Sequence, residues 1–489
     1  MLSLREWLIQ NNVYLDQRLS IKTVPSLRVV ANLAIEPNST VARIPKSLVL
    51  SHRTSSLSRL LPAFPSFLHH LAPTVQLSIY VLYELQLGDR SRWKGYFDHC
   101  PKETVDIGLL WEEEGNARNW VKGTELEREL RRIGITKTLL STIFNTVVLP
   151  LFSALPSTSS LPLKPPRLDT FLYAYSLVSS RAFQVDTYHA LALVPLADAF
   201  NHSSPNHVHF ASDTWVCEEC GQLEECPHDD SNAGEVRREE DGDGQTCDMV
   251  TTEEGVLEGE EVFNSYGNLS NARLIAEYGF ALEANEWDTI SFEEAEVHEV
   301  LGRPGAMSVD SDLTIRPSEL EEEDHPLIAP PSSKFPRSLH FDADARLSHS
   351  LWTTAALSVL QRYRPKPADR QNDSERLDEL AQTLAGLVEE EEKEELGEDF
   401  GIDETDAVIL EGIAQIVINL CSTRLRGQYR PELTGTQLLD LAETAEDRRE
   451  KLAIEFTAGE RLLLERVKQN WNQFTKSVDG QEQCSSGSS

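Results

Sequence analysis

Five side chains that commonly bind metal ions lie within one short polar stretch of the sequence: Cys217, Cys220, Cys226, His228 and Cys247. Zinc prefers tetrahedral coordination by sulfur and nitrogen, and Cys-x-x-Cys is its usual half-site. The most economical ligand set is Cys217, Cys220 and Cys247, with Cys226 or His228 as the fourth ligand. Such a zinc ion would be structural and would fix the base of a mobile segment. The alternative is a set of unliganded thiols in a mobile loop.

Two further segments carry side chains that could bind a ligand and orient a reacting group. Residues 194–202 end in Asp198-x-x-Asn201-His202, and residues 259–267 end in Tyr266-Gly267. Taken alone, Asn201-His202 before Ser-Ser-Pro is compatible with a simple Asx-type turn, and Tyr266 with a strand aromatic at a turn. The two segments lie about 60 residues apart and follow Ser-Arg-x-Phe at residues 180–183. This combination favours one composite site over isolated turns.

Together these segments resemble the two signature motifs of the SET domain. The amino-acid sequences of the two motifs are most similar to those of the subgroup that contains the Rubisco large-subunit and ribosomal-protein lysine methyltransferases. Residues 180–183 match the SRxF segment of that subgroup, and residues 44–51 match its IPxxLxLS strand. The last part of the chain, with Gly459-Glu460 on a long helix, resembles the substrate-binding domain of the subgroup. The resemblance covers most of the chain in order.

The resemblance implies methyl transfer from S-adenosylmethionine to a lysine amine, a displacement that needs no metal. The enzyme must deliver a neutral amine, align it with the methyl group and exclude water. A free lysine has a pKa of about 10.4, so neutralising it at pH 7 costs roughly 4–5 kcal/mol. Desolvation in a narrow apolar channel lowers that pKa. The resemblance gives Tyr266 the catalytic role of holding the amine in line, in contact with both cofactor and substrate.

The same resemblance assigns the binding residues. Asn201 and His202 would hold S-adenosylmethionine, with Asp198 supporting the same turn and contacting substrate. Arg181 would lie near the cofactor carboxylate, where a bidentate guanidinium–carboxylate pair suits the geometry, and near the substrate. Tyr278 would line the lysine channel. The alternatives are a structural salt bridge for Arg181 and simple core packing for Tyr278.

One segment departs from the pattern of the subgroup. Its members usually carry a G-x-G turn whose backbone lies against the cofactor, and the matching positions here are Ser26, Leu27 and Arg28. Glycine allows close backbone approach, which a residue with a long side chain does not obviously allow. We therefore assign these three residues to the cofactor site by position. Backbone hydrogen bonds can survive such a change, so the missing glycines do not by themselves imply weaker cofactor binding.

The charge of the chain restricts its partners. Asp and Glu outnumber Lys and Arg by 80 to 45, which gives a formal net charge of −35. A potential of that sign repels nucleic acid and anionic membranes and attracts basic polypeptides, although ordinary solubility would also explain it. Much of the excess lies in local runs such as residues 321–324 and 389–392. We expect no nucleic-acid partner and no membrane partner.

Location and assembly follow from weaker signals. No apolar run reaches the roughly 20 residues that span a bilayer, and the first residues lack the pattern of a signal peptide. Seven cysteines are an odd number, so a disulfide framework is not expected in a reduced compartment. We expect a monomer in the cytoplasm, the nucleus or both.

Hydrophobic periodicity predicts the elements that must position these residues. A helix is expected at residues 3–11, strands at 27–31 and 41–44, and helices from about 74 to 88, 139 to 150 and 168 to 179. Short strands return between 190 and 282, around a polar excursion at 218–245. Beyond residue 348 the pattern is helical, with one apolar stripe through Ile409, Ile413 and Leu420 and another through Val467 and Trp471.

The expected fold class is α+β: a SET domain of small β-sheets with a pseudoknot and a helical insert, followed by an all-α substrate-binding domain. A chain of 489 residues is too long for one compact core. The predicted divisions are 1–54, the N-terminal SET part; 55–180, the helical insert; 181–300, the C-terminal SET part with the Cys-rich insert 217–247; 301–345, a linker; 346–478, the helical domain; and 479–489, a disordered tail.

The predicted function is therefore lysine methylation of a protein substrate with S-adenosylmethionine as cofactor and a structural zinc ion as an additional candidate. The resemblance points to a ribosomal protein as the first substrate class and to a histone-like basic protein as the second. Two alternatives stay open. The chain could be a non-catalytic SET-fold module that binds proteins, or histidine could be the acceptor.

Overall fold

The computed structural model describes residues 3–24, 26–60, 68, 70–155, 164–223, 226, 228, 246–302, 325–330, 338–363, 373–392 and 403–485. The chain forms two compact units. The first contains Met1–Trp111, Ile133–Leu269 and Arg273–Leu282, and the second contains Glu112–Arg132, Ser270–Ala272 and Glu283–Ser489. Most of the polar excursion at 218–245 and of the linker at 301–345 lies outside the described residues.

The first unit is built on a four-stranded antiparallel sheet in the order β1-β4-β8-β7. Val41, Ala42 and Ile44 on β4 are buried, whereas Arg43 between them is exposed and pairs with Asp248 on β8. Two further antiparallel pairs, β2-β3 and β5-β6, belong to this unit. The strands are β1 (Tyr14–Leu15), β2 (Leu19–Lys22), β3 (Arg28–Ala31), β4 (Thr40–Pro45), β5 (Ala182–Gln184), β6 (Leu191–Leu193), β7 (Val208–Ser212) and β8 (Thr246–Thr251).

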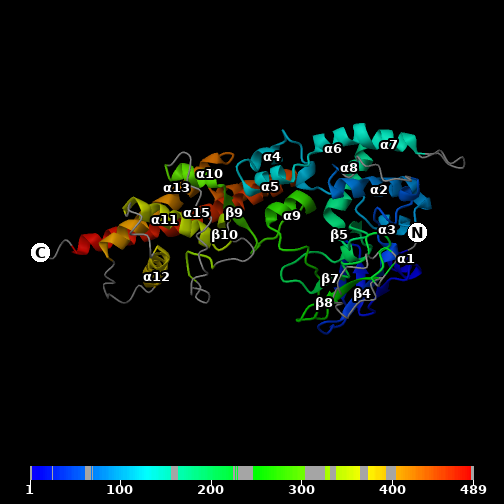
Figure 1. Cartoon of the computed structure of the whole chain (residues 1–489), viewed down its shortest axis with the longest axis horizontal. Helices are drawn as coiled ribbons and strands as arrows, with labels where there is room; N and C mark the ends of the chain where they lie inside the picture. The colour runs from blue at the N-terminus through cyan, green and yellow to red at the C-terminus, as the bar shows by residue number, and fades with distance from the viewer. Residues whose placement is uncertain are drawn as a thin grey trace. The chain divides into compact units, whose positions relative to one another are not determined.

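Helices α2 and α8 pack side by side against these strands (Figure 1). Helix α2 begins with Pro73 and ends at Gly88, which has a positive φ of 55°, as the sequence predicts. Helix α8 buries Phe171 and Tyr175 and ends at Arg181, so it delivers Arg181 directly to the start of β5. The α-helices of this unit are α1 (Leu4–Gln10), α2 (Pro73–Leu87), α3 (Lys94–Phe97), α6 (Lys137–Ile143), α7 (Leu149–Ala154), α8 (Leu168–Arg181) and α9 (Asn271–Tyr278), of which residues 273–278 belong to this unit.

The helix expected to end at Pro150 continues past it. A π-helical turn, η6 (Phe144–Val148), joins α6 to α7, and Pro150 lies in the first turn of α7. A proline is tolerated in a first turn because its missing N–H has no partner there. The prediction of a helix end at this residue was therefore wrong.

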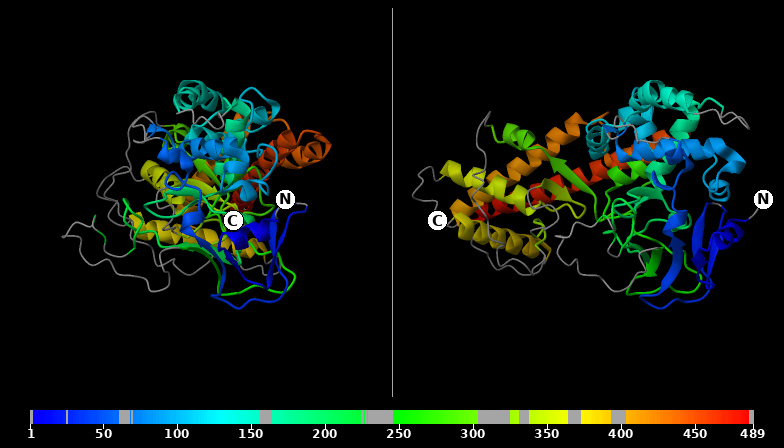
Figure 2. Two further views of the ribbon diagram at one scale, coloured as in Figure 1. Left: turned by 90° about the vertical axis from the view of Figure 1, so that its right-hand side faces the viewer. Right: turned by 45° about the vertical axis from the view of Figure 1, so that its right-hand side comes forward.

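The second unit is a helical array with one small β-pair. Helix α15 runs beside α13 along much of the unit (Figure 2). Ile409, Ile413, Leu420, Val467 and Trp471 all lie in its core, which confirms the two predicted stripes. The elements are α4 (Asn116–Trp120), α5 (Glu125–Ile133), β9 (Thr289–Phe292), α10 (Glu294–Val300), β10 (Leu339–Asp342), α11 (His349–Tyr363), α12 (Asp373–Glu392), α13 (Glu404–Gly427), α14 (Gly435–Thr444) and α15 (Arg448–Ser485).

Two local features of this unit differ from the sequence analysis. Residues 339–342, assigned to a linker, form β10 and pair with β9, so the unit is not purely helical. Four residues carry too short an alternation to stand out beside a Pro- and Ser-rich segment. Helix α15 also extends to Ser485, past Gly480 where a disordered tail was expected.

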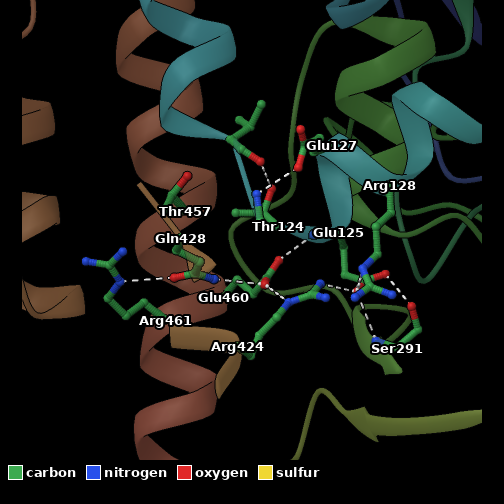
Figure 3. A network of polar contacts seen from close by, with 12 residues as sticks. Thr124, Glu125, Glu127, Arg128, Ser291, Arg424, Gln428, Thr457, Glu460 and Arg461 are labelled. Atoms are coloured by element: carbon green, nitrogen blue, oxygen red, sulfur yellow. Dashed lines mark hydrogen bonds and ion pairs between the residues drawn. The ribbon is translucent and has the colours of Figure 1, made fainter. Parts of the chain in front are cut away.

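A buried polar network links α5, β9, α13 and α15 within the second unit (Figure 3). The Arg424 guanidinium pairs with the carboxylates of Glu125 and Glu460. Glu125 also accepts from the Ser291 N–H at 3.0 Å and its hydroxyl at 2.7 Å. Gln428 donates to Glu460 at 2.9 Å. Burial and the neighbouring Glu460 raise the pKa of Glu125. Arg424 pairs with both carboxylates, and Arg128 Nε lies 3.7 Å from the Glu125 carboxylate.

Within the part of the chain that the structure describes, two stretches have the length and hydropathy of a membrane-spanning helix, Glu125–Ala154 and Glu404–Gly427. The second is α13, whose apolar residues lie in the core of its unit. The first is interrupted at residues 134–136 between α5 and α6. Length and composition alone do not separate a membrane helix from the core helix of a globular unit.

Asp288 provides a test of pH-dependent stability in the second unit. Its carboxylate accepts from the backbone N–H of Asn271 at 2.6 Å and from the Asn271 side-chain amide at 2.8 Å. Burial raises the pKa of Asp288 to about 6. The folded protein therefore binds this proton more tightly than the unfolded chain, so the contribution is present below about pH 4 and is lost as pH rises to about 6. We expect a loss of roughly 2 kcal/mol over that window.

The Asp288→Asn variant should lose this dependence. The difference in Tm between wild type and variant should change by roughly 4–8 °C between pH 4 and pH 7, with the variant gaining relative to wild type at pH 7. Asp440→Asn, at an exposed position on α14, is the matched control. A Tm difference that stays constant across this range would contradict the assignment.

Candidate active site

The two motif segments cross each other in the first unit. The Asn264 N–H donates to the Asn201 carbonyl at 2.7 Å, and the Ser203 N–H donates to the Asn264 carbonyl at 3.2 Å. His202 and Asn264 form a parallel bridge, and the Phe263 carbonyl accepts from the N–H groups of residues 207 and 208. This pairing brings together side chains that lie 64 positions apart in the chain.

Three aromatic rings stack beside this crossing. The Tyr266 N–H donates to His202 Nδ1 at 3.1 Å, so that ring nitrogen carries no proton. The rings of His202 and Tyr266 lie 5.1 Å apart at 22°, and those of Tyr266 and Tyr278 lie 5.0 Å apart at 26°. Burial lowers the pKa of His202. The imidazole is therefore neutral near pH 7 and acts as a fixed part of the wall.

Both tyrosines are protonated phenols at neutral pH. Burial raises the pKa of Tyr266, and burial raises the pKa of Tyr278 to about 12. The Tyr266 hydroxyl points toward the Phe200 carbonyl, at 3.4 Å. A hydroxyl that donates to a carbonyl keeps its own lone pairs available to accept a hydrogen bond.

Asp198 and Arg181, two more of the predicted site residues, form an ion pair. Asp198 lies on the 3-10 turn η7 (Ala197–Ala199), and its Oδ2 accepts from Arg181 Nη1 at 3.0 Å and from the Tyr96 hydroxyl at 2.8 Å. Burial disfavours the charge of Arg181, but the neighbouring Asp198 carboxylate more than offsets this and raises the pKa of the guanidinium. Arg181 therefore forms the salt bridge that was considered as its alternative role. It also lines the pocket described in the next paragraph.

A pocket of about 160 Å³ contains four of the predicted site residues: Arg181, Asp198, Tyr266 and Tyr278. Arg181 Nε and Asp198 Oδ1 are buried and have no hydrogen-bond partner among the described residues. The remaining lining residues are Ser180, Ala182, Phe183, Gln184, Phe210 and Ser265. The pocket thus combines aromatic walls with unsatisfied polar atoms, which is typical of a site for an amphipathic ligand.

The residues at the altered glycine motif lie next to Asn201. The Asn201 Nδ2 donates to Glu261 Oε1 at 2.7 Å and approaches the Leu27 carbonyl at 3.4 Å. The Arg28 guanidinium donates to the Val24 carbonyl at 2.8 Å and lies 3.8 Å from the Glu261 carboxylate. The Val24 carbonyl and the Glu261 carboxylate therefore hold the Arg28 side chain in place. Ser26 is exposed.

Two residues without a predicted role now join the site. Glu261 connects Asn201 to Arg28, and Asn264 forms the crossing. Both side-chain polar atoms of Asn264 are buried without a partner among the described residues, a costly arrangement that a ligand would relieve. Glu261 and Asn264 both lie within the motif at residues 259–267, so the sequence motif could have identified them as site residues. Phe210 carried no signal beyond being an aromatic residue in a short strand.

Among the described residues, one group could hold a metal ion: Cys217, Cys220, Cys226 and His228. Backbone N–H groups of Cys220 and Glu219 lower the pKa of Cys217 to about 7, which favours the thiolate. Cys247 is not part of this group. It is buried in β8 opposite Ile44 and Ser212, and burial raises the pKa of its thiol to about 12. The structure therefore brings together Cys217, Cys220, Cys226 and His228 but does not place Cys247 with them.

The fold of this chain is that of the SET domain of Rubisco LSMT. The SET domain of LSMT bound to methyllysine and AdoHcy superposes with a TM-score of 0.55 at 19% identity and covers 98% of this chain and 93% of that one. Rubisco LSMT bound to AdoMet superposes with a TM-score of 0.53 at 19% identity and covers 98% and 92%. These comparisons confirm the predicted fold class.

Two curated relatives carry the resemblance in sequence. Ribosomal lysine N-methyltransferase 3 of Saccharomyces cerevisiae is 32% identical, over 25% of this chain and 31% of that protein. N-lysine methyltransferase SETD6 of Rattus norvegicus is 26% identical, over 60% of this chain and 55% of that protein. The chain thus spans about a third to about half of the length of these relatives. No protein-family model matches the chain.

Proposed function

We propose that this protein transfers the methyl group of S-adenosylmethionine to the side-chain amine of a lysine in a protein substrate. The observation that carries the proposal is the placement of the Tyr266 phenol. It lies in a pocket with Arg181, Asp198 and Tyr278, directly beside the crossing of residues 201–203 with Asn264. One side of Tyr266 thus faces a narrow aromatic pocket, and its backbone is fixed by the segment proposed to hold the cofactor.

The residues at the crossing suit S-adenosylmethionine. That molecule carries an amine, a carboxylate and an adenine ring, so it needs donors and acceptors together. The unpartnered amide of Asn264 offers one of each, and the Asn201–His202 backbone and the Leu27 carbonyl lie beside it. When bound, S-adenosylmethionine supplies a methyl carbon made electrophilic by a positively charged sulfur. Asn201, His202 and Asn264 would hold it.

The protein must then present a neutral amine to that carbon. The walls formed by Tyr266, Tyr278, Phe183 and Phe210 remove water from a lysine side chain and lower its pKa. The Tyr266 oxygen can accept a hydrogen bond from the amine, because its own proton points toward the Phe200 carbonyl. That hydrogen bond leaves the nitrogen lone pair free to point at the methyl carbon. Asp198, held by Arg181 and Tyr96, stays fixed at the pocket wall.

The substrate class follows from charge and from the relatives. A net charge of −35 attracts a basic polypeptide. Ribosomal lysine N-methyltransferase 3 is named for a ribosomal substrate, so a ribosomal protein is our first proposal and a histone-like basic protein our second. The helical second unit would recruit that protein. Cytoplasm and nucleus are the proposed locations, and a monomer is the proposed state.

The test is labelling with radioactive S-adenosylmethionine. Purified protein is incubated with salt-washed ribosomes, with core histones and with a lysate of the source cell, and labelled bands are analysed by mass spectrometry. We expect a methylated lysine in a basic protein. A label on histidine would correct the acceptor. Tight binding of the methyl donor without any transfer would support a non-catalytic binding module, and absence of binding would refute the proposal.

A further inference from the structure

The four candidate metal ligands lie close to one another. The Sγ atoms of Cys217, Cys220 and Cys226 and a ring nitrogen of His228 all lie within 4.8 Å of one another. The His228 Nδ1 lies 3.8 Å from Cys217 Sγ and 3.7 Å from Cys226 Sγ. Zinc–sulfur bonds of about 2.3 Å and zinc–nitrogen bonds of about 2.0 Å in a tetrahedron place such atoms roughly 3.5–3.8 Å apart. The two distances from His228 Nδ1 agree with this spacing, and the 4.8 Å limit on the others means that small movements would bring all four atoms to one zinc ion.

The backbone of the Cys-x-x-Cys segment has the turn that such a site needs. The Gly221 N–H donates to the Cys217 carbonyl at 2.8 Å, and the Cys217 N–H donates to the Gln222 carbonyl at 2.9 Å. Gly221 has a φ of +75°, and a Cβ there would lie 2.9 Å from the Tyr188 ring. Glycine is thus required both by the turn and by the ring packed against it.

The sulfur atoms are not explained by disulfides. None of the six cysteines that the structure describes belongs to a disulfide. A disulfide between two of the three clustered thiols would leave one thiol and an imidazole facing it without a partner. Three thiolates and one imidazole satisfy a tetrahedral zinc ion completely, which is the pattern of a structural site, since a catalytic site keeps one position for water.

We propose that Cys217, Cys220, Cys226 and His228 form a structural zinc site that closes the base of the segment between β7 and β8. The site is independent of the methyl-transfer centre, and the proposal does not depend on the function of that centre.

Several contacts connect the proposed zinc site to the β5–β6 hairpin, whose first strand lines the candidate active-site pocket. Arg53 donates to the Glu218 carbonyl at 2.8 Å and to the Tyr188 carbonyl at 3.3 Å, and its guanidinium lies 4.8 Å from the centre of the Tyr188 ring. The Thr187 N–H donates to the Thr214 carbonyl at 3.0 Å. Residues 187 and 188 belong to the loop that joins β5 to β6, and β5 supplies Phe183 and Gln184 to the pocket. Zinc would therefore also stabilise this loop.

Metal analysis of the full-length chain tests the proposal. Protein purified without chelator or metal-affinity resin should contain about one zinc ion per chain. His228→Ala, at an exposed position, should lose most of that zinc without unfolding the protein, and Cys217→Ser/Cys220→Ser should lose all of it. Cobalt added to metal-free protein should give the intense visible absorption of a tetrahedral thiolate site, and this absorption should be absent from both variants.

Cys247→Ala is the matched control. It removes a thiol from the same part of the sequence but from outside the cluster, so it should keep the full zinc content. Loss of zinc in Cys247→Ala with retention in His228→Ala would overturn the ligand assignment. Wild-type protein that is isolated without zinc and gives no cobalt absorption would overturn the site. If the double serine variant fails to fold, His228→Ala and the cobalt spectrum still decide the question.

Discussion

Replacing Tyr266 with phenylalanine should reduce methyl transfer to lysine by about 100-fold or more, because a misplaced acceptor nitrogen alone has an effect of that size. The substitution removes only the hydroxyl that would orient the amine. The ring stacks on His202 and Tyr278 are kept. The hydroxyl lies 3.4 Å from the Phe200 carbonyl, too far for a strong hydrogen bond, so its loss should cost little stability.

The readout separates chemistry from binding. Single-turnover rates with saturating substrate should fall, while the Kd for S-adenosylmethionine should change by less than about threefold, since a weak hydrogen bond is worth roughly 0.5 kcal/mol. Tyr14→Phe removes the same hydroxyl from a side chain that is 50% exposed on β1, and it should leave the rate unchanged. Near-normal turnover by the Tyr266→Phe protein would show that this phenol does not orient the amine.

Replacing Arg424 with methionine should destabilise the second unit by about 3–5 kcal/mol, the usual cost of leaving buried charge unpaired. The Arg424 side chain is 5% exposed and the Glu460 side chain 4%. Without the guanidinium, Glu460 would lose its ion-pair partner at a buried site, and Glu125 would keep the more distant Arg128, at 3.7 Å. For a unit of this size the change corresponds to a fall in Tm of roughly 6–20 °C.

Scanning calorimetry is the suitable measurement, because a chain with two compact units need not unfold in one step. Arg426→Met, two positions away on α13 and exposed, should change Tm by less than about 2 °C. Adding Glu460→Gln to Arg424→Met should recover part of the loss by removing one of the two opposed charges. A single variant with unchanged Tm would mean that water or rearrangement already satisfies Glu125 and Glu460.

The motif residues were predictable because their types and order carry the resemblance. Arg181, Asp198, Tyr266 and Tyr278 were each named from the sequence, and they line one pocket. Their meeting point was not visible in any local pattern. It depends on the pairing of Asn264 with residue 201, and long-range pairing of this kind leaves no periodicity in either segment.

The cysteine residues show what sequence spacing cannot decide. Cys247 lies close in sequence to the other cysteines, but it alternates with Met249 and Thr251 as the inward-facing residues of β8. That alternation predicts a β-strand in which Cys247 faces the core, and this prediction conflicts with the interpretation of Cys247 as a zinc ligand. Likewise, residues 112–132 group with the C-terminal helices through contacts more than 300 positions apart, such as Glu125 with Glu460. Composition and periodicity cannot reveal such a partner.

The crossing of residues 201–203 with Asn264 has a consequence for the order of folding. The two strands of the crossing cannot meet until the roughly 60 residues between them have been made and looped back, and closing such a loop carries an entropic cost that grows with its length. During synthesis, helices α2 and α8 can pack before this happens, because both precede the crossing in the chain. Refolding should therefore show helix formation well before ligand affinity returns, as is usual for non-local pairing.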